Sequence, residues 1–130
     1  MSDIELSQEL CAFIEQSPSM FHAVAAIAER LEAAGFSKLS EQNAWELAPG
    51  DARYVMRNNS SLIAFKIGSR TSAESLRFQM AAAHSDSPMF KVKHVPELDG
   101  AGETLRLDVE AYGGMIDSTW LDRPLGKVLL

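Results

Sequence analysis

A histidine and an aspartate stand two residues apart where an apolar run ends. Residues 81–83 are alanines, and His84, Ser85 and Asp86 follow them. Residues two apart in an extended chain point to the same side, so the carboxylate of Asp86 is expected beside the imidazole of His84. A carboxylate that accepts the hydrogen of one imidazole nitrogen leaves the other nitrogen free to bind a metal ion. His84 is therefore a candidate metal ligand, and Asp86 is the candidate residue that orients it.

Spacing alone leaves two other interpretations of this stretch open. A histidine and an aspartate at this spacing are common in proteins, so a purely structural role also fits. Ser85 and Ser87 suggest a serine hydrolase, but the members of a catalytic triad converge from separate elements. Neighbouring residues at one strand end do not easily supply that geometry, which disfavours the hydrolase.

The remaining residues of chemical interest have simpler interpretations. His22 falls on a predicted helix, and His94 falls in an alternating strand where solvent or a nearby acid satisfies it. Cys11 is expected to pack near the edge of the core, as free cysteines usually do. The carboxylates are scattered and form no tight pair that would mark general acid–base catalysis. Three methionines are expected to fill the core: Met80, Met89 and Met115.

The chain that carries this site is predicted to begin with two helices. Ser17 and Pro18 predict the start of the second helix, because serine caps helices and proline suits the first helical position. Gly35 is placed to end that helix. The first helix is predicted over residues 3–16, where apolar residues recur at helical spacing: Leu6, Leu10, Phe13 and Ile14. The chain is thus expected to open with a helical hairpin.

Strand signals follow the helices. Residues 53–57 and 62–67 flank the polar residues 58–61 and predict a β-hairpin. Residues 76–83 read LRFQMAAA and predict a strand close to full burial. His84 then lies at the carboxyl end of a buried strand, which is where open α/β sheets place ligands and catalytic groups.

Two half-exposed strands are predicted further along the chain. Apolar and charged residues alternate over residues 90–95 and 105–110, which is typical of a strand with one face in solvent. Residues 96–102 are predicted to form a loop. Residues 127–130 are interpreted as the opening of one more strand.

Helices followed by strands place the chain in the α/β class, with a mixed sheet. Its 130 residues suit one domain, without repeats, low-complexity tracts or an interdomain linker. The sequence stops inside an apolar run, which suggests a fragment of a longer domain.

Composition narrows the class of function. The net charge of −6 disfavours binding to nucleic acid or to an anionic membrane, because both require a positive face. No apolar run is long enough to cross a membrane, and the acidic N-terminus is unlike a signal peptide. The single cysteine, Cys11, permits no internal disulfide and fits the reducing cytoplasm.

Four stretches together resemble the aspartyl aminopeptidase family of zinc metallopeptidases. Residues 84–93, HSDSPMFKVK, resemble the metal-site segment of the family. Residues 13–23 resemble its N-terminal helical hairpin, and residues 58–65 resemble its Asn-x-Ser hairpin. Residues 112–123, YGGMIDSTWLDR, resemble its Tyr-Gly-Gly…Thr-Trp-x-Asp-Arg signature, which is long and specific. The resemblance covers nearly the whole chain.

The resemblance implies an aminopeptidase that releases N-terminal amino acids from peptides. Two zinc ions would share a bridging water or hydroxide that attacks the scissile carbonyl. His84 would bind one zinc, and Asp86 would orient His84 rather than attack. The family's bridging aspartate, general-base glutamate and remaining ligands lie downstream. The resemblance also implies a homo-oligomer, and an α/β/α catalytic domain of which residues 1–130 form the N-terminal part, ahead of an oligomerisation domain.

The chain departs from the family pattern at two places, and two other functions compete with the peptidase. Residues 124–128 form a junction, around Leu125 and Gly126, shorter than is usual in the family. Asp117 stands where family members often carry other residues, histidine among them. Because a catalytic zinc needs three protein ligands, the chain alone is expected to be inactive. It would then be a non-catalytic module that binds a partner or self-associates through sheet edges. The third alternative is a different metal-assisted hydrolase completed by a second chain.

Overall fold

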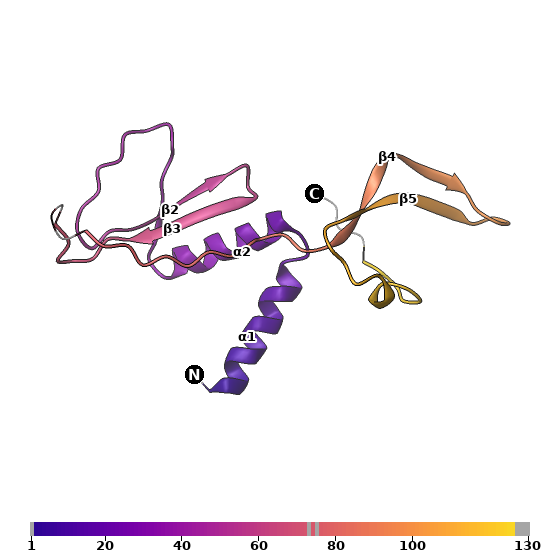
Figure 1. Cartoon of the computed structure of the whole chain (residues 1–130), viewed down its shortest axis with the longest axis horizontal. Coiled ribbons are helices and arrows are strands. Elements are labelled where there is room, and N and C mark those ends of the chain that lie inside the picture. The colour runs from indigo at the N-terminus through magenta and orange to yellow at the C-terminus, as the bar shows by residue number, and fades with distance from the viewer. Residues whose placement is uncertain (1, 73, 75, 127–130) are drawn as a thin grey trace. The chain divides into compact units, whose positions relative to one another are not determined.

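The computed structural model describes residues 2–72, 74 and 76–126. The chain divides into two compact units, unit 1 (Met1–Asp86) and unit 2 (Ser87–Leu130). Within the described residues, unit 1 carries two α-helices and a three-stranded sheet, and unit 2 carries a two-stranded ribbon and a short 3-10 helix (Figure 1). Among these residues, no helix combines the length and the apolar character that a membrane crossing requires.

Helix α1 spans Asp3–Gln16, as predicted. A capping box fixes its start, because the backbone N–H of Glu5 donates to Ser2 Oγ at 3.3 Å and the backbone N–H of Ser2 donates to Glu5 Oε2 at 2.7 Å. No side chain of α1 is buried. Cys11, expected at the edge of the core, is instead exposed on this helix, because α1 is only lightly covered by the rest of unit 1.

Helix α2 spans Met20–Ala33 and begins later than predicted. Ser17 does not cap it. Instead, the backbone N–H of Ser17 donates to the carbonyl of Ile14 at 3.0 Å and so closes the last turn of α1. The N-cap of α2 is Ser19, whose Oγ lies 2.8 Å from Nδ1 of His22. The prediction of Ser17 as the cap is wrong, because the Ser17–Pro18 pair forms the turn between the two helices.

Gly35 ends α2, as predicted. Its φ of +86° is left-handed, a conformation that glycine adopts at little cost. The backbone N–H of Gly35 donates to the carbonyl of Glu32, and that of Phe36 donates to the carbonyl of Leu31, both at 2.9 Å. This pair of hydrogen bonds is a Schellman motif, which satisfies carbonyls that the helix leaves unpaired.

Unit 1 contains a mixed sheet, as predicted. The strands are β1 (Ser37–Lys38), β2 (Ala52–Arg57) and β3 (Ser61–Lys66), in the order β1-β2-β3. Strand β1 runs parallel to β2, whereas β2 and β3 are antiparallel. The β2–β3 pair is the predicted hairpin.

The hairpin turn is set by two asparagines. Asn58 and Asn59 have φ values of 50° and 53°, and the backbone N–H of Ser60 donates to the carbonyl of Arg57 at 3.0 Å. Positive φ at both central residues matches a type I′ turn, whose twist suits a β-hairpin. Asparagine tolerates this backbone better than most residues.

The core of unit 1 lies between α2 and the hairpin. Helix α2 contacts β3, and the side chains of Val24 and Tyr54 are each only 1% exposed. The hydroxyl of Tyr54 donates to Oε1 of Glu32 at 2.5 Å, and this hydrogen bond, together with burial, raises the pKa of Tyr54. The buried apolar residues are Ala23, Val24, Ala26, Ala28, Tyr54 and Val55.

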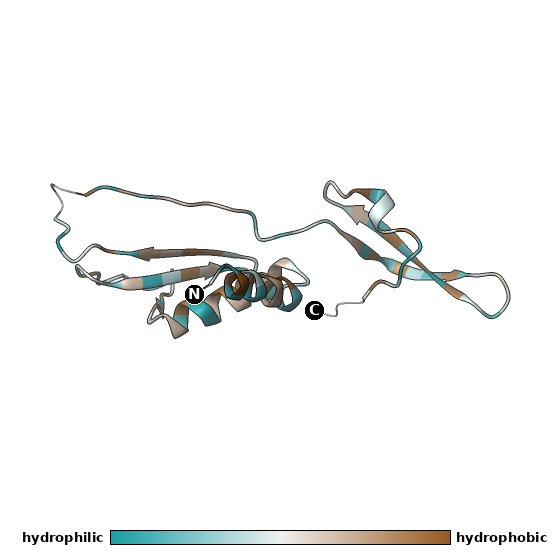
Figure 2. Cartoon of the chain, turned by 90° about the horizontal axis from the view of Figure 1, so that it is seen from below, coloured by the Kyte–Doolittle hydropathy of each residue, from teal (hydrophilic) through white to brown (hydrophobic). Residues whose placement is uncertain are grey.

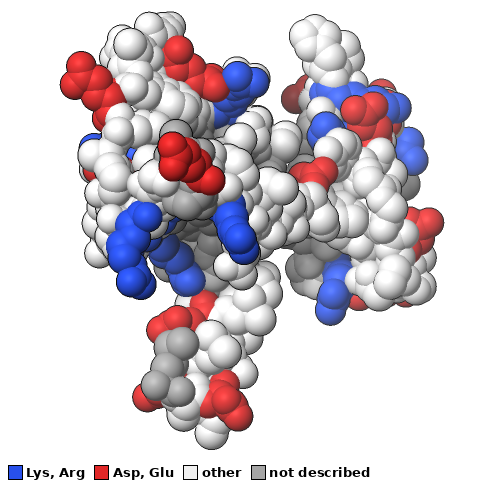
Figure 3. All heavy atoms as spheres, turned by 60° about the vertical axis from the view of Figure 1, so that its left-hand side comes forward, with Lys and Arg blue, Asp and Glu red and all other residues white. Residues whose placement is uncertain are grey.

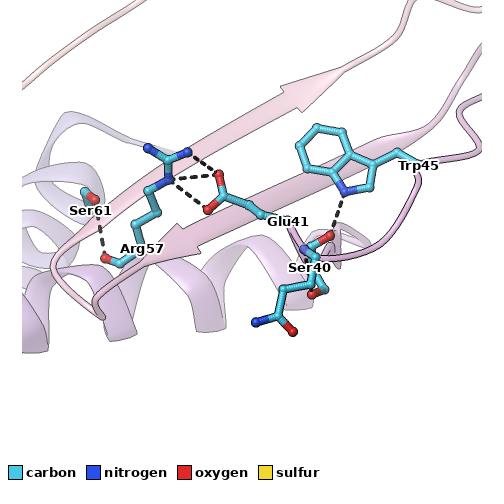
Figure 4. Close-up of polar contacts among 6 residues, drawn as sticks. Ser40, Glu41, Trp45, Arg57 and Ser61 are labelled. Atoms are coloured by element: carbon cyan, nitrogen blue, oxygen red, sulfur yellow. Dashed lines mark hydrogen bonds and ion pairs between the residues drawn. The ribbon is translucent and has the colours of Figure 1, made fainter.

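The loop before β2 is tied to the hairpin by polar contacts (Figure 4). Nε of Arg57 donates to both carboxylate oxygens of Glu41 at 2.8 Å, and this hydrogen bonding lowers the pKa of Glu41. Nε1 of Trp45 donates to the carbonyl of Ser40 at 2.7 Å, and its ring stacks on Phe65 with centroids 6.2 Å apart. Figure 3 shows acidic and basic side chains interspersed over one face of the molecule.

Unit 2 is built on the antiparallel strands β4 (Met89–Asp99) and β5 (Leu105–Tyr112). Both are longer than the predicted strands, and β4 continues through Pro96, which was predicted to lie in a loop. The register shifts between Val92 and Glu97. Proline has no N–H to donate and is tolerated at such an irregularity, so the strand bends there instead of ending.

Residues 76–88 form neither helix nor strand. The prediction of a buried strand over residues 76–83 is wrong, because none of the described strands pairs with it. Phe78 is 79% exposed, and Met80, expected to fill the core, is 88% exposed. Figure 2 shows the residues just before β4 as a coil. Residues 127–130, predicted to open another strand, lie outside the described residues.

Candidate metal-binding segment

His84 and Asp86 are in contact, in a segment without regular structure. Nδ1 of His84 lies 2.7 Å from the backbone carbonyl oxygen of Asp86 and 3.1 Å from its carboxylate Oδ1. A backbone carbonyl only accepts hydrogen bonds, so Nδ1 carries the proton and donates. In the neutral ring the lone pair is then on Nε2, and this tautomer is the one that metal-binding histidines use when a partner holds the other nitrogen.

The surroundings of His84 differ from the expected strand end. Its side chain is 82% exposed, since the preceding alanines are themselves exposed rather than packed in a sheet. The contact with Asp86 therefore follows from the two-residue spacing and not from a neighbouring strand. An exposed imidazole with an available Nε2 is accessible to a metal ion and to further ligands.

Ser85 joins this segment to the hairpin of unit 1. Its Oγ donates to the carbonyl of Ser60 at 3.0 Å, across 25 positions of the sequence, in partly buried surroundings. Ser60 belongs to the Asn58–Asn59 turn. The sequence contained a signal for this turn in its two asparagines, but no feature of the sequence indicated that the turn meets Ser85.

Gly113 makes a second contact that sequence reasoning missed. A Cβ on Gly113 would lie 3.3 Å from Cα of Pro88, and the φ of Gly113 is +79°. The neighbouring residues Met89 and Tyr112 are paired across β4 and β5. Glycine is thus required twice over, by the left-handed backbone and by the close approach of Pro88.

The other two histidines have surroundings of their own. His22 bonds to Ser19 at the start of α2, and His94 is exposed on β4. Among the described residues, no three histidine, cysteine, aspartate or glutamate side chains lie together in a way that could hold a metal ion. Histidine is a suitable zinc ligand, so the residues present fit one ligand of a zinc site and not a complete site.

The hydrogen bonds of this segment do not match those of a serine hydrolase. The hydroxyl of Ser85 donates to the carbonyl of Ser60, and the N–H at Nδ1 of His84 donates to the carbonyl of Asp86. A serine nucleophile needs a base that accepts its own hydrogen. Neither side chain fills that role for the other, which argues against a serine hydrolase.

Comparison with known proteins gives a consistent family assignment. The family model described as "Aminopeptidase I zinc metalloprotease (M18)" matches residues 13–128. The chain is 48% identical over 121 residues to a probable M18 family aminopeptidase 2 of Pseudomonas paraeruginosa. That alignment covers 93% of this chain and 28% of the relative, so the chain spans less than a third of the length of this curated relative.

Solved structures agree in fold. The mApe1 structure of Chaetomium thermophilum matches with a TM-score of 0.85 and 29% identity, over 92% of this chain and 27% of that chain. The mApe1 dodecamer of Saccharomyces cerevisiae matches with a TM-score of 0.74 and 32% identity, over 91% of this chain and 27% of that chain. The resemblance to aspartyl aminopeptidases is thereby confirmed, and the chain belongs to the M18 family of zinc aminopeptidases.

Proposed function

We propose that this chain supplies His84 as one zinc ligand of an aminopeptidase that releases N-terminal amino acids from peptides. The observation that carries the proposal is the hydrogen bond from Nδ1 of His84 to Asp86, 2.7 Å to the carbonyl and 3.1 Å to the carboxylate. It leaves Nε2 as the ring nitrogen with a lone pair. Membership of a zinc metalloprotease family supports zinc as the metal.

Asp86 has an orienting role in this proposal. Its two oxygens hold the imidazole in one tautomer and limit rotation of the ring, so that Nε2 keeps its direction when the metal arrives. A negative carboxylate next to the ring also makes the imidazole a better donor to a cation. Asp86 does not itself attack the substrate.

The rest of the ligand set comes from elsewhere in this proposal. A catalytic zinc takes three protein ligands and an open position, and the described residues offer no group of three. We place the other ligands in the remainder of a full-length polypeptide comparable in length to the curated relatives, of which this chain covers 28%. When bound, zinc supplies a Lewis acid and an activated water for peptide hydrolysis.

Peptide substrates and homo-oligomeric assembly complete the proposal. An aminopeptidase of this family acts on peptides, and the S. cerevisiae relative was solved as a dodecamer. We infer a homo-oligomer for the full-length protein on that basis. The 130-residue chain alone is expected to be inactive, because one ligand does not form a catalytic zinc site.

The test compares two exposed histidines in the full-length protein. His84→Ala is expected to lower release of p-nitroaniline from Asp-, Glu- and Leu-p-nitroanilide, and to lower zinc content, because a direct ligand is lost. The loss of activity should exceed the roughly 10–100-fold cost of removing a group that only orients a ligand. His94→Ala, on strand β4, is the matched control and should leave both quantities unchanged.

Two results would count against the proposal. One is that His84→Ala keeps full activity and zinc content. The other is that the 130-residue chain shows zinc-dependent activity that His84→Ala removes, since the other ligands would then lie within these residues. The measurements are initial rates and zinc per polypeptide by elemental analysis.

A further inference from the structure

The hydroxyl of Ser85 makes a long-range contact that the proposed function does not use. Its Oγ donates to the carbonyl of Ser60 at 3.0 Å, and both residues are partly buried. His84 and Asp86, on either side of Ser85, contact each other instead. The three residues thus divide two tasks. His84 is the candidate ligand with Asp86 as its orienting partner, and Ser85 attaches the segment to the hairpin of unit 1.

The acceptor of this hydrogen bond is held in place. Ser60 ends the type I′ turn, in which Asn58 and Asn59 have φ values of 50° and 53° and the N–H of Ser60 donates to the carbonyl of Arg57 at 3.0 Å. Strands β2 and β3 are paired from Ala52–Lys66 to Arg57–Ser61. The carbonyl of Ser60 is therefore fixed by a continuous hydrogen-bonded hairpin.

An attachment at Ser85 matters because the surrounding segment has no regular secondary structure. Residues 76–88 form no strand, and the side chain of His84 is 82% exposed. A metal ligand binds tightly only when its direction is set before the metal arrives. Asp86 sets the ring relative to its own backbone, but that backbone needs an anchor to the rest of the protein.

We propose that Ser85 is a positioning residue: its hydrogen bond to the Ser60 carbonyl fixes the backbone next to His84, so that Nε2 points in a fixed direction for zinc. This inference rests on the proposed function, because it takes His84 as the ligand. It assigns a reason to the Asn58–Asn59 turn as well: the turn presents the acceptor that locates the metal-binding segment.

The experiment measures zinc affinity of the full-length protein by competition with a chelator. Ser85→Ala removes the donor and is expected to weaken zinc binding about 10–100-fold, the usual cost of losing a group that orients a ligand. Ser85→Thr keeps the hydroxyl and should restore affinity to near the wild-type value. Ser87→Ala, an exposed serine two positions away, is the matched control and should bind zinc normally.

A second readout separates positioning from general destabilisation. The melting temperature of the zinc-free protein should change little in Ser85→Ala, because the variant loses only one hydrogen bond, and that bond is only partly buried. Should Ser85→Ala fail to fold, Asn59→Ala decides the question. It disfavours the left-handed turn that presents the Ser60 carbonyl, and it should weaken zinc binding in the same direction.

The possible outcomes distinguish this inference from the proposed function. Normal zinc affinity in Ser85→Ala, with weak affinity in His84→Ala, overturns the role of Ser85 and leaves His84 as the ligand. Normal affinity in both variants overturns both proposals. Equal weakening in Ser85→Ala and Ser85→Thr, or in Ser87→Ala, also overturns the role of Ser85, because the hydroxyl would not be the cause.

Discussion

Strand β2 and the segment that carries His84 both contain aromatic side chains, but these are buried in β2 and exposed in the segment. Tyr54 in β2 is 1% exposed, whereas Phe78 is 79% exposed, although each sits in an apolar stretch of the sequence. Strand β2 has hydrogen-bonded neighbours on both sides, β1 and β3, and α2 packs on the same unit. The segment around Phe78 pairs with no described strand. An apolar pattern is thus buried only where neighbouring elements are present to cover it.

The candidate chemistry lies in the less supported of these two regions. The core between α2 and the β2–β3 hairpin is held by burial, while the His84 segment is held by hydrogen bonds, such as the one from Ser85 to Ser60 at 3.0 Å. Groups that bind ligands need access, and access is incompatible with full burial. Changes in the first region should therefore affect stability, and changes in the second should affect function.

The largest expected difference compares the two aromatic residues directly. Tyr54→Ala should lower the free energy of unfolding of the 130-residue chain by about 3–5 kcal/mol, because it leaves a cavity in the core. Phe78→Ala should change it by less than about 0.5 kcal/mol, because the ring is already in water. Urea unfolding followed by circular dichroism measures both. Comparable losses in the two variants would mean that the two regions do not differ as described.

A smaller effect is expected at the end of α2. Gly35 has a φ of +86° and open space where a Cβ would lie, so Gly35→Ala adds backbone strain but no clash. The expected loss is about 1 kcal/mol of unfolding free energy, and Gly35→Asn should lose less. Gly114 has no positive φ and also has open space, so Gly114→Ala is the control. A neutral Gly35→Ala would show that the Schellman motif contributes little.

An effect of similar size, confined to one hydrogen bond, concerns the hydroxyl of Tyr54, which donates to Glu32. The hydrogen bond from Tyr54 to Glu32 is the main cause that raises the pKa of Tyr54 above its ordinary value of 10.0. Below about pH 10 the phenol is neutral in both the folded and unfolded chains, so its contribution is fully present. Above that pH the unfolded chain ionises first, and the contribution is lost as pH rises through the folded-state pKa.

Tyr54→Phe isolates this contribution. At neutral pH the wild-type chain should be more stable than the variant by about 1 kcal/mol, the usual net value of one hydrogen bond. The difference should shrink as the pH rises above about 10, and unfolding free energies at several pH values measure it. A difference that is constant with pH would contradict the assigned pKa shift.

Much of the secondary structure of unit 1 was predictable, because the sequence features that specify it act over short distances along the chain. The capping serine and glutamate of α1, the left-handed Gly35 and the Asn58–Asn59 turn each act over a few residues. Local interactions of this kind do not depend on the rest of the chain. The contact of His84 with Asp86 also follows from a two-residue spacing, and the family signature was readable directly.

The errors have one physical origin, which is that a residue with a clear local signal is used differently by another part of the chain, near or distant in sequence. Ser17 had the chemistry of a cap but was used to close α1, and Ser19 took the position. Residues 76–83 had the pattern of a buried strand, but a strand exists only where a partner supplies hydrogen bonds. Pro96 looked like a loop residue, yet the pairing of β4 with β5 resumes beyond it.

The sequence by itself determined the family, the helices and the hairpin, and the candidate ligand His84 with its orienting partner Asp86, because residue types and short spacings decide each of these. Only the tertiary structure decided which apolar stretches are buried and that Ser85 meets the carbonyl of Ser60 at 3.0 Å. That contact joins residues 25 positions apart. Long-range contacts depend on how whole elements pack, and short spacings along the chain do not encode that packing.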